Sequence, residues 1–257
     1  MKELFIRAIS GLLIVLLSIF IISKGGSLLA YFIFLLSLIG IREFYRAVEN
    51  IKIKPVKIIG YISCVGFLLN ALGIKWVSVS LILFFAVAAL LTTLVFKKDI
   101  KLLDIAMTLF GIFYIPFLMQ HIIYLDGSIY IWLIFITAWG TDTMAYLSGS
   151  IFGKNKLCPQ ISPKKTIEGS IGGILGSVLL TLAYGIYYQL SPIWFFLLLS
   201  FVASIIAQIG DLIASKLKRI TGIKDFGFIM PGHGGILDRF DSILFTAPLI
   251  YYMVNLL

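Results

Sequence analysis

Charged residues are scarce in this chain, and their scarcity argues against a water-soluble fold. Only 13% of the 257 residues are charged, whereas 60% are hydrophobic. A soluble domain averages roughly 25% charged residues and about 45–50% apolar ones. Because packing in water cannot hide so many apolar side chains, lipid is the expected solvent for most of the chain. The sequence therefore predicts an integral membrane protein.

Cysteine is scarce, and we expect no cleavable leader. Of the two cysteines, Cys64 lies in an apolar run and Cys158 in a polar stretch, and their spacing forms neither a metal motif nor a disulfide framework. We expect two free thiols, with Cys158 facing a reducing cytoplasm. Lys2 and Arg7 precede an apolar run, but no small-x-small cleavage site follows. We therefore expect the run to be retained as the first membrane span.

Acidic residues are outnumbered, with 12 Asp and Glu against 21 Lys and Arg, for a net charge of +9. In a soluble protein this balance would indicate a nucleic-acid partner. In a membrane protein its first explanation is topology, because basic residues stay on the cytoplasmic side. Attraction to anionic lipid head groups or phosphorylated substrates is the second. We expect the bilayer, and no nucleic acid, as a partner.

The long apolar runs predict an all-α polytopic fold with about nine transmembrane helices. A span needs about 17–25 apolar residues. The expected spans are residues 5–23, 27–46, 57–73, 76–96, 102–124, 129–150, 169–189, 192–214 and 237–256.

The positive charges provide an independent check on that count. If the N-terminus is cytoplasmic and nine spans alternate, 19 of the 21 basic residues fall on the cytoplasmic side. One span more or fewer would scramble this distribution. The sequence thus predicts a cytoplasmic N-terminus and an outer C-terminus in a multi-pass protein of the cell (inner, cytoplasmic) membrane.

Polar sequence is concentrated in the second half of the chain. Residues 1–128 read as an N-terminal group of about five spans, and residues 129–257 as a catalytic transmembrane region. The second region contains two long cytoplasmic loops, 151–168 and 215–236, rich in Gly, Lys, Pro, Ser and Asp. We expect the chemistry in these loops and in the adjoining span ends, so that the active site faces the cytoplasm.

The first constellation of polar residues surrounds the loop 151–168. Asp142 lies inside an apolar span, where an ionisable group is a functional candidate. Tyr146 follows four residues later and shares its helix face. The motif SPKKTIEG then places two ammonium groups beside hydroxyls, which suits phosphate oxygens; its candidate residues are Ser162, Lys164, Lys165, Thr166 and Glu168.

Three glycines follow this motif and open the next span. Gly169, Gly172 and Gly173 could expose backbone N–H groups to an anion at a helix N-terminus. The alternative is a solvated, topology-determining loop followed by a small-residue packing face. The sequence leaves both open.

The second constellation spans residues 208–242. Gln208, Asp211 and Ser215 share one helix face, and Asp238 and Asp241 point the same way on another. Three gathered carboxylates need either basic partners or a hard divalent cation. A structural salt-bridge network would explain the charges but not the accompanying PGHGG segment, which avoids bulk where a ligand could approach. His233, in that segment, could be a phosphate contact, a proton carrier or a plain loop residue.

These motifs match a known family. The pattern from Ser215 through Leu217, Lys218, Arg219, Lys224, Asp225 and Gly227, then Pro231, His233–Ile236 and Asp238–Asp241, resembles the signature of phosphatidate cytidylyltransferases, or CDP-diacylglycerol synthases. Met230 stands where the family usually has Leu, Ile or Phe. The resemblance is strong over residues 139–252, and residues 1–130 match only as generic spans.

The resemblance implies a reaction in which CTP and phosphatidic acid give CDP-diacylglycerol and pyrophosphate. Both reactants are anions, so charge neutralisation and alignment are the main tasks. No side-chain nucleophile is needed, which agrees with the absence of a Ser–His–Asp arrangement. The resemblance also implies Mg²⁺, with a second cation left open, and a homodimer.

We expect distinct roles for the candidate residues. Asp211 and Asp238, at the two ends of the loop, are the expected metal ligands, and Asp241 is either a further ligand or a partner of Arg239. Four basic residues are expected to bind phosphates: Lys218, Arg219, Lys224 and Arg239. The expected substrate contacts also include Asp142, Tyr146, Ser162, Lys164, Lys165, Thr166, Glu168, Ser215, Asp225 and His233.

Three other functions fit the sequence less well. A transporter would share the many spans and interrupted helices, but here charge gathers beside two loops and no inverted repeat is visible. A CDP-alcohol phosphatidyltransferase would carry an Asp-Gly-x-x-Ala-Arg motif, which this chain lacks. A non-catalytic scaffold would tolerate degenerate loops, whereas these loops look complete.

Overall fold

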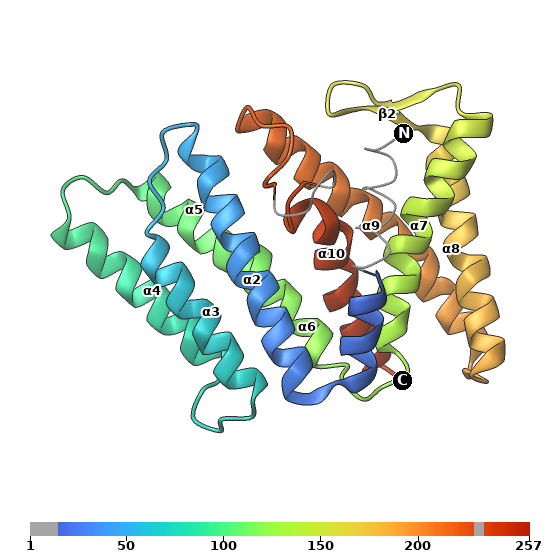
Figure 1. Ribbon diagram of the computed structural model, residues 1–257, viewed down its shortest axis with the longest axis horizontal. Coiled ribbons are helices and arrows are strands. Elements are labelled where there is room, and N and C mark those ends of the chain that lie inside the picture. Colours follow the sequence, from blue (N-terminus) through green and yellow to red (C-terminus); the bar gives the residue numbers. More distant parts are fainter. Residues whose placement is uncertain (1–14, 229–233) are drawn as a thin grey trace. The chain divides into compact units, whose positions relative to one another are not determined.

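The computed structural model describes residues 15–228 and 234–257 and is dominated by helices (Figure 1). The chain divides into two compact units. The first comprises described residues within Met1–Gly127 and Ile220–Arg239, and the second comprises Ser128–Arg219 and Phe240–Leu257. The sequence predicted a catalytic region that begins at residue 129. Because that boundary is defined by function and not by packing, it stays a prediction.

The first unit is a helical bundle centred on α2. Its elements are the helix Val15–Lys24, α2 (Gly26–Glu49), α3 (Lys57–Ala71), α4 (Val79–Phe96), α5 (Leu102–Ile112), the π-helix η1 (Phe113–Phe117) and α6 (Leu118–Ile123). Helices α5, η1 and α6 are consecutive, and the π turn accommodates Pro116, whose ring cannot donate a helical hydrogen bond. A span predicted as one helix is therefore continuous but irregular.

Tyr45 of α2 illustrates how this bundle is packed. Its ring is fully buried, and its hydroxyl donates to the Thr108 carbonyl oxygen at 2.9 Å. Gly60 and Gly111 lie against the ring, so that a methyl group at either position would overlap it. Two glycines thus allow α3 and α5 to approach α2 closely.

The second unit carries most of the motif residues. Its elements are α7 (Ile131–Phe152), β1 (Lys156–Cys158), β2 (Ser162–Thr166), α8 (Ile167–Tyr187), α9 (Ile193–Ile220) and α10 (Leu237–Val254), the last two extending into the first unit at one end. Strands β1 and β2 pair antiparallel. The polar loop expected at 151–168 is thus a short β-hairpin, which joins α7 to α8.

Helices α7 and α8 pack through small residues. A methyl group at Gly173 would lie 2.9 Å from both the Thr141 carbonyl oxygen and the Ala145 Cβ. Gly172 lies similarly close to Ser148. At the start of α8, the buried Thr166 hydroxyl accepts the Gly169 N–H at 3.1 Å. The packing interpretation of these glycines is therefore confirmed.

Five helices are long and apolar enough to cross a bilayer: α2, α4, the run Leu102–Ile123, α8 and α9. They correspond to five of the predicted spans, and they support an all-α, multi-pass membrane protein. Helix α3 has 15 residues. Helices α7 and α10 are long enough but stand outside this set. Helix α7 contains Asp142, and three charged residues lie in the first turns of α10. The total of nine spans and their orientation stay predictions.

Candidate active site

A cavity of about 290 Å³ opens in the second unit between α7, the hairpin, α8 and α9. Its lining brings both sequence constellations together. The polar side chains on its wall are Asp142, Tyr146, Ser150, Lys164, Lys165, Thr166, Ser170, Gln208 and Asp211. Cationic and anionic groups therefore face one space, as a site for a phosphorylated ligand and a cation requires.

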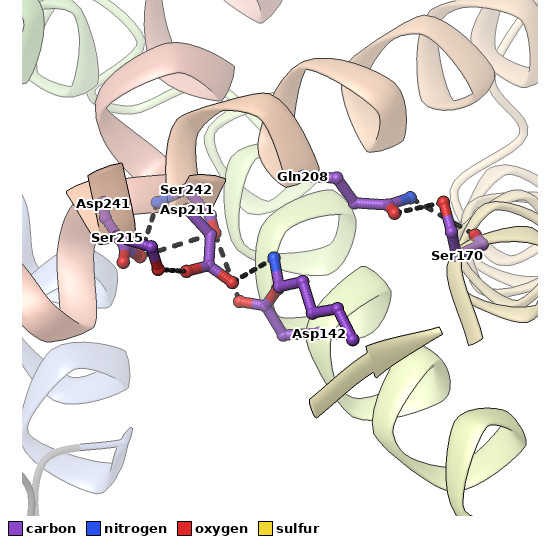
Figure 2. A network of polar contacts seen from close by, with 8 residues as sticks. Asp142, Ser170, Gln208, Asp211, Ser215, Asp241 and Ser242 are labelled. Atoms are coloured by element: carbon purple, nitrogen blue, oxygen red, sulfur yellow. Dashed lines mark hydrogen bonds and ion pairs between the residues drawn. The ribbon is translucent and has the colours of Figure 1, made fainter. Parts of the chain in front are cut away.

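Asp211 is the centre of the contacts beside this cavity. Its Oδ2 forms an ion pair with the Lys165 ammonium group, and its Oδ1 accepts the Ser215 hydroxyl at 3.3 Å. Figure 2 shows Asp211 with Ser215, Asp241 and Ser242 beside it, while the Gln208–Ser170 pair lies apart from them. The pairing of α9 with the SPKKTIEG motif was not foreseen from the sequence, which placed the two in separate constellations.

Asp241 adds a buried carboxylate from α10. Its residue is 7% exposed, and the charged groups facing it are Asp211, Asp142 and Lys218. Ser242 connects two of these carboxylates, since its N–H donates to Asp241 Oδ1 at 2.8 Å and its hydroxyl to Asp142 Oδ2 at 3.2 Å. Asp142 of α7, Asp211 of α9 and Asp241 of α10 are here called the aspartate cluster, and they thus come from three different helices.

The aspartate cluster suits a hard cation in the chemistry of its donors. Its ligating atoms are all carboxylate oxygens, and Mg²⁺ typically takes one or two carboxylates and completes its shell with water and phosphate. Among the residues that the structure describes, no group of three or more His, Cys, Asp or Glu could hold a metal ion on its own. The predicted Mg²⁺ site stays a prediction.

Comparison of the sequence with known proteins identifies the family of this chain. The model of the cytidylyltransferase family matches residues 5–257. The chain belongs to the cytidylyltransferase family. Proteins named phosphatidate cytidylyltransferase from Staphylococcus epidermidis and Staphylococcus aureus are 39% and 37% identical to it, over 254 and 255 residues. Each alignment covers 95% of this chain and 96% of the relative. The resemblance inferred from the motifs is confirmed, and it extends through the N-terminal half.

Other candidate residues of this cytidylyltransferase support the hairpin. Glu168 accepts the N–H groups of Lys154 at 3.1 Å and Asn155 at 3.2 Å, and Asn155 Nδ2 at 2.8 Å. Arg219 Nε donates to the Ile161 carbonyl oxygen at 3.3 Å. Ser162 begins β2, and Thr166 caps α8. These contacts position the hairpin beside α9, and the expected substrate contacts of these residues stay predictions.

The remaining candidates lie in the first unit or outside the described residues. Lys224 and Asp225 line a separate cavity of about 400 Å³, which Arg46 of α2 also lines. Asp238 accepts the N–H groups of Phe226 at 2.8 Å and Gly235 at 2.9 Å. Arg239 is exposed next to it on α10, and His233 lies outside the described residues. Since Asp211 and Asp238 belong to different units, their joint metal binding stays a prediction.

Sequence reasoning missed Ser242 and Ser170 beside the cavity, and it also missed Glu43, a buried carboxylate of α2 in the first unit. Ser242 and Ser170 had no signal beyond their neighbours in the motifs. Glu43 did have one, because it is an acidic residue within a predicted span. Its neighbours Arg42 and Arg46 were interpreted as topology signals, and this interpretation obscured the carboxylate between them.

Proposed function

We propose that this chain is a phosphatidate cytidylyltransferase, which converts CTP and phosphatidic acid into CDP-diacylglycerol and pyrophosphate. The observation that carries the proposal is the Lys165–Asp211 ion pair on the wall of a cavity that Asp142 and Lys164 also line. Such a wall offers cations to phosphates and carboxylates to a metal ion. The names of the bacterial relatives supply the specific reaction.

The proposed chemistry is one in-line displacement. An oxygen of the lipid phosphate forms a bond to the α-phosphorus of CTP, and the bond from that phosphorus to the bridging oxygen of the β-phosphate breaks. Pyrophosphate leaves with the electron pair. The attacking oxygen is already ionised at neutral pH, so the protein has to align two anions and neutralise their charge.

The lysines of the hairpin are the proposed phosphate ligands. Lys164 is exposed and Lys165 half-buried at the cavity wall. Lys165 neutralises Asp211 in this structure, so a metal ion on Asp211 would release the Lys165 ammonium group for a substrate phosphate. Asp142 and Tyr146 would form the opposite wall against CTP or the lipid head group, and Lys218, Arg219, Lys224 and Arg239 would add positive charge.

Asp211 and Asp238 would hold Mg²⁺, with Asp241 as a further oxygen donor. When bound, Mg²⁺ would stabilise negative charge on the attacking and leaving oxygens. The carboxylate oxygens of the aspartate cluster support the roles of Asp211 and Asp241 in this assignment, and the role of Asp238 rests on its place in the motif. A homodimer, implied by the family resemblance, stays a prediction, and a second cation stays open.

The membrane arrangement that we propose has nine spans, a cytoplasmic N-terminus and an outer C-terminus. The 19 basic residues on one side of this arrangement support it. The active site would then face the cytoplasm, where CTP is present.

Product formation by the purified protein tests the proposal. Detergent-solubilised protein should convert labelled CTP into a chloroform-soluble product only when phosphatidic acid and Mg²⁺ are both present. A protein that instead moves label across sealed vesicles without converting CTP would be a transporter, and the proposal would fail.

A further inference from the structure

Glu43 is a carboxylate of α2 to which the proposed reaction assigns no role. It is 5% exposed and lies near the C-terminal end of the helix. Its Oε1 accepts the N–H of Ile236 at 3.1 Å, and its Oε2 accepts the N–H of Leu237 at 3.0 Å. Both oxygens of one buried side chain are therefore used to hold a backbone segment 193 residues or more away.

That segment is the beginning of α10, and the two residues before the helix have no side chain that could cap it. The first N–H groups of a helix need outside acceptors, usually a Ser, Thr, Asn or Asp side chain just before the helix. Gly235 and Ile236 precede Leu237, and neither has a side chain that can accept a hydrogen bond. Glu43 supplies the missing acceptors, and its negative charge complements the positive end of the helix dipole.

Two glycines make room for this contact. A methyl group at Gly235 would lie 2.5 Å from the Glu43 Cδ, and one at Gly227 would lie 2.9 Å from the same atom. Gly227 and Gly235 come before and after residues 229–233, which the structure does not describe, and the Glu43 carboxylate is packed against both glycines. The described residues 226–227 and 235–237 are called the loop ends below. The absence of side chains at Gly227 and Gly235 thus leaves space for the Glu43 carboxylate.

The same two loop ends hold Asp238. Its Oδ2 accepts N–H groups from Phe226, beside Gly227, and from Gly235. Glu43 therefore holds the backbone at Ile236 and Leu237, and Asp238 holds the adjoining backbone at Phe226 and Gly235. A shift of the Glu43 contact would move the backbone that orients the Asp238 carboxylate.

We infer that Glu43 is a positioning residue: from the N-terminal helices it caps α10 and fixes the loop ends that orient Asp238 for the reaction. The inference rests on the proposed function, since Asp238 is assigned a part in cytidylyl transfer there. It also gives the N-terminal helices a role beyond packing.

The test compares Glu43→Gln with Glu49→Gln in full-length protein. Glutamine keeps the size of Glu43 but presents one oxygen and one NH₂ group to two N–H donors, so one hydrogen bond is lost. Glu49 lies on the same helix and is partly exposed in an ion pair with Lys57, so Glu49→Gln removes the same charge without touching α10. For each variant, kcat per folded protein, the unfolding temperature and backbone hydrogen–deuterium exchange are measured.

We expect Glu43→Gln to lower kcat by roughly ten-fold, because small displacements of a reacting group are costly. Exchange at Phe226 and Gly235 should accelerate, whereas Glu49→Gln should match the wild type in both readouts. A folded Glu43→Gln protein with wild-type kcat, or with unchanged exchange at these amides, would overturn the inference. Rapid exchange at Ile236 and Leu237 in the wild type would also overturn the inference, and this measurement does not depend on the folding of a variant.

The exchange measurement separates this inference from the proposed function. If the wild-type protein makes no lipid product, the proposed function fails and the role in catalysis fails with it. If the wild type is active and only the variant comparison is negative, the failure belongs to Glu43 alone.

Discussion

At the scale of single residues, Asp211 connects the two halves of the candidate site. Its carboxylate pairs with Lys165 from the hairpin and accepts the Ser215 hydroxyl from its own helix. Asp241, from α10, faces it from a buried position. An intramembrane carboxylate with such partners is costly to bury, and its cost is consistent with a functional role.

Replacing Asp211 by Asn should reduce turnover by roughly 100-fold or more, a loss typical of removing one electrostatic contact to the reacting groups. The amide cannot pair with Lys165 or offer an anionic oxygen to a metal ion. The measurement is the initial rate of lipid product at saturating CTP, together with the unfolding temperature.

Asp99→Asn is the matched control, since Asp99 is exposed in the turn between α4 and α5. It should leave the rate within about two-fold of the wild type, as expected of a surface substitution away from the site. If Asp211→Asn kept near-wild-type rates while folded, Asp211 would not be a metal ligand.

Replacing Lys165 by Gln should lower kcat/KM for CTP by roughly ten-fold to 100-fold, because a charge-assisted contact to phosphate is lost. Lys154→Gln is the comparison, because Lys154 contributes its backbone N–H to Glu168. Steady-state kinetics over a range of CTP concentrations checks the difference. If the two substitutions lowered kcat/KM equally, Lys165 would have no specific contact with CTP.

At the scale of elements, the contact between α7 and α8 holds the cavity walls together. Thr141 and Ala145 of α7 lie against Gly173 of α8, while Asp142 and Tyr146 of the same α7 segment line the cavity. The spacing of the two helices therefore sets the distance between the cavity wall and the hairpin lysines.

Gly173→Ala should separate these helices, because the new methyl group would meet the Thr141 carbonyl oxygen at 2.9 Å. Overpacking of this kind costs about 1–3 kcal/mol of folding free energy. The unfolding temperature in detergent should fall and activity should fall with it. Ala183→Val adds bulk at an exposed position of α8 and should change neither the unfolding temperature nor the activity. If the two variants behaved alike, close packing would not be the role of Gly173.

Sequence patterns predicted the elements well where hydrophobicity alone decides them. The apolar runs located α2, α4, α8 and α9, and the motif spacing placed Asp211 and Ser215 on one helix face. The hairpin at 156–166 was missed, since short polar strands lack a hydrophobic period. The Lys165–Asp211 pair was missed because it joins residues 46 positions apart, which local periodicity cannot relate.

At the scale of the whole molecule, the family match and the distribution of charge describe one multi-pass protein. The cytidylyltransferase model covers both the N-terminal helices and the motif-rich half. Basic residues fall on one side of the predicted topology. The hairpin carrying Lys164 and Lys165 should therefore face the cytoplasm.

The native cysteines allow this orientation to be tested. Cys158 is half-buried in β1, whereas Cys64 is 1% exposed in α3. A membrane-impermeant maleimide should label the wild-type protein in inverted vesicles and leave it unlabelled in right-side-out vesicles. A cysteine introduced at the exposed Asn255, in a variant whose Cys158 is replaced by Ser, should give the opposite pattern. Labelling of Cys158 from the outer side would reverse the proposed topology.

The transfer of a specific phosphorus atom tests the central claim most directly. Purified protein is given phosphatidic acid, Mg²⁺ and CTP labelled in either the α- or the γ-phosphate. We predict that the α-label enters the lipid while an equal amount of γ-label is released as pyrophosphate, and that Asp211→Asn suppresses both. Entry of the γ-label into lipid, or no transfer of either label by the folded protein, would contradict the account.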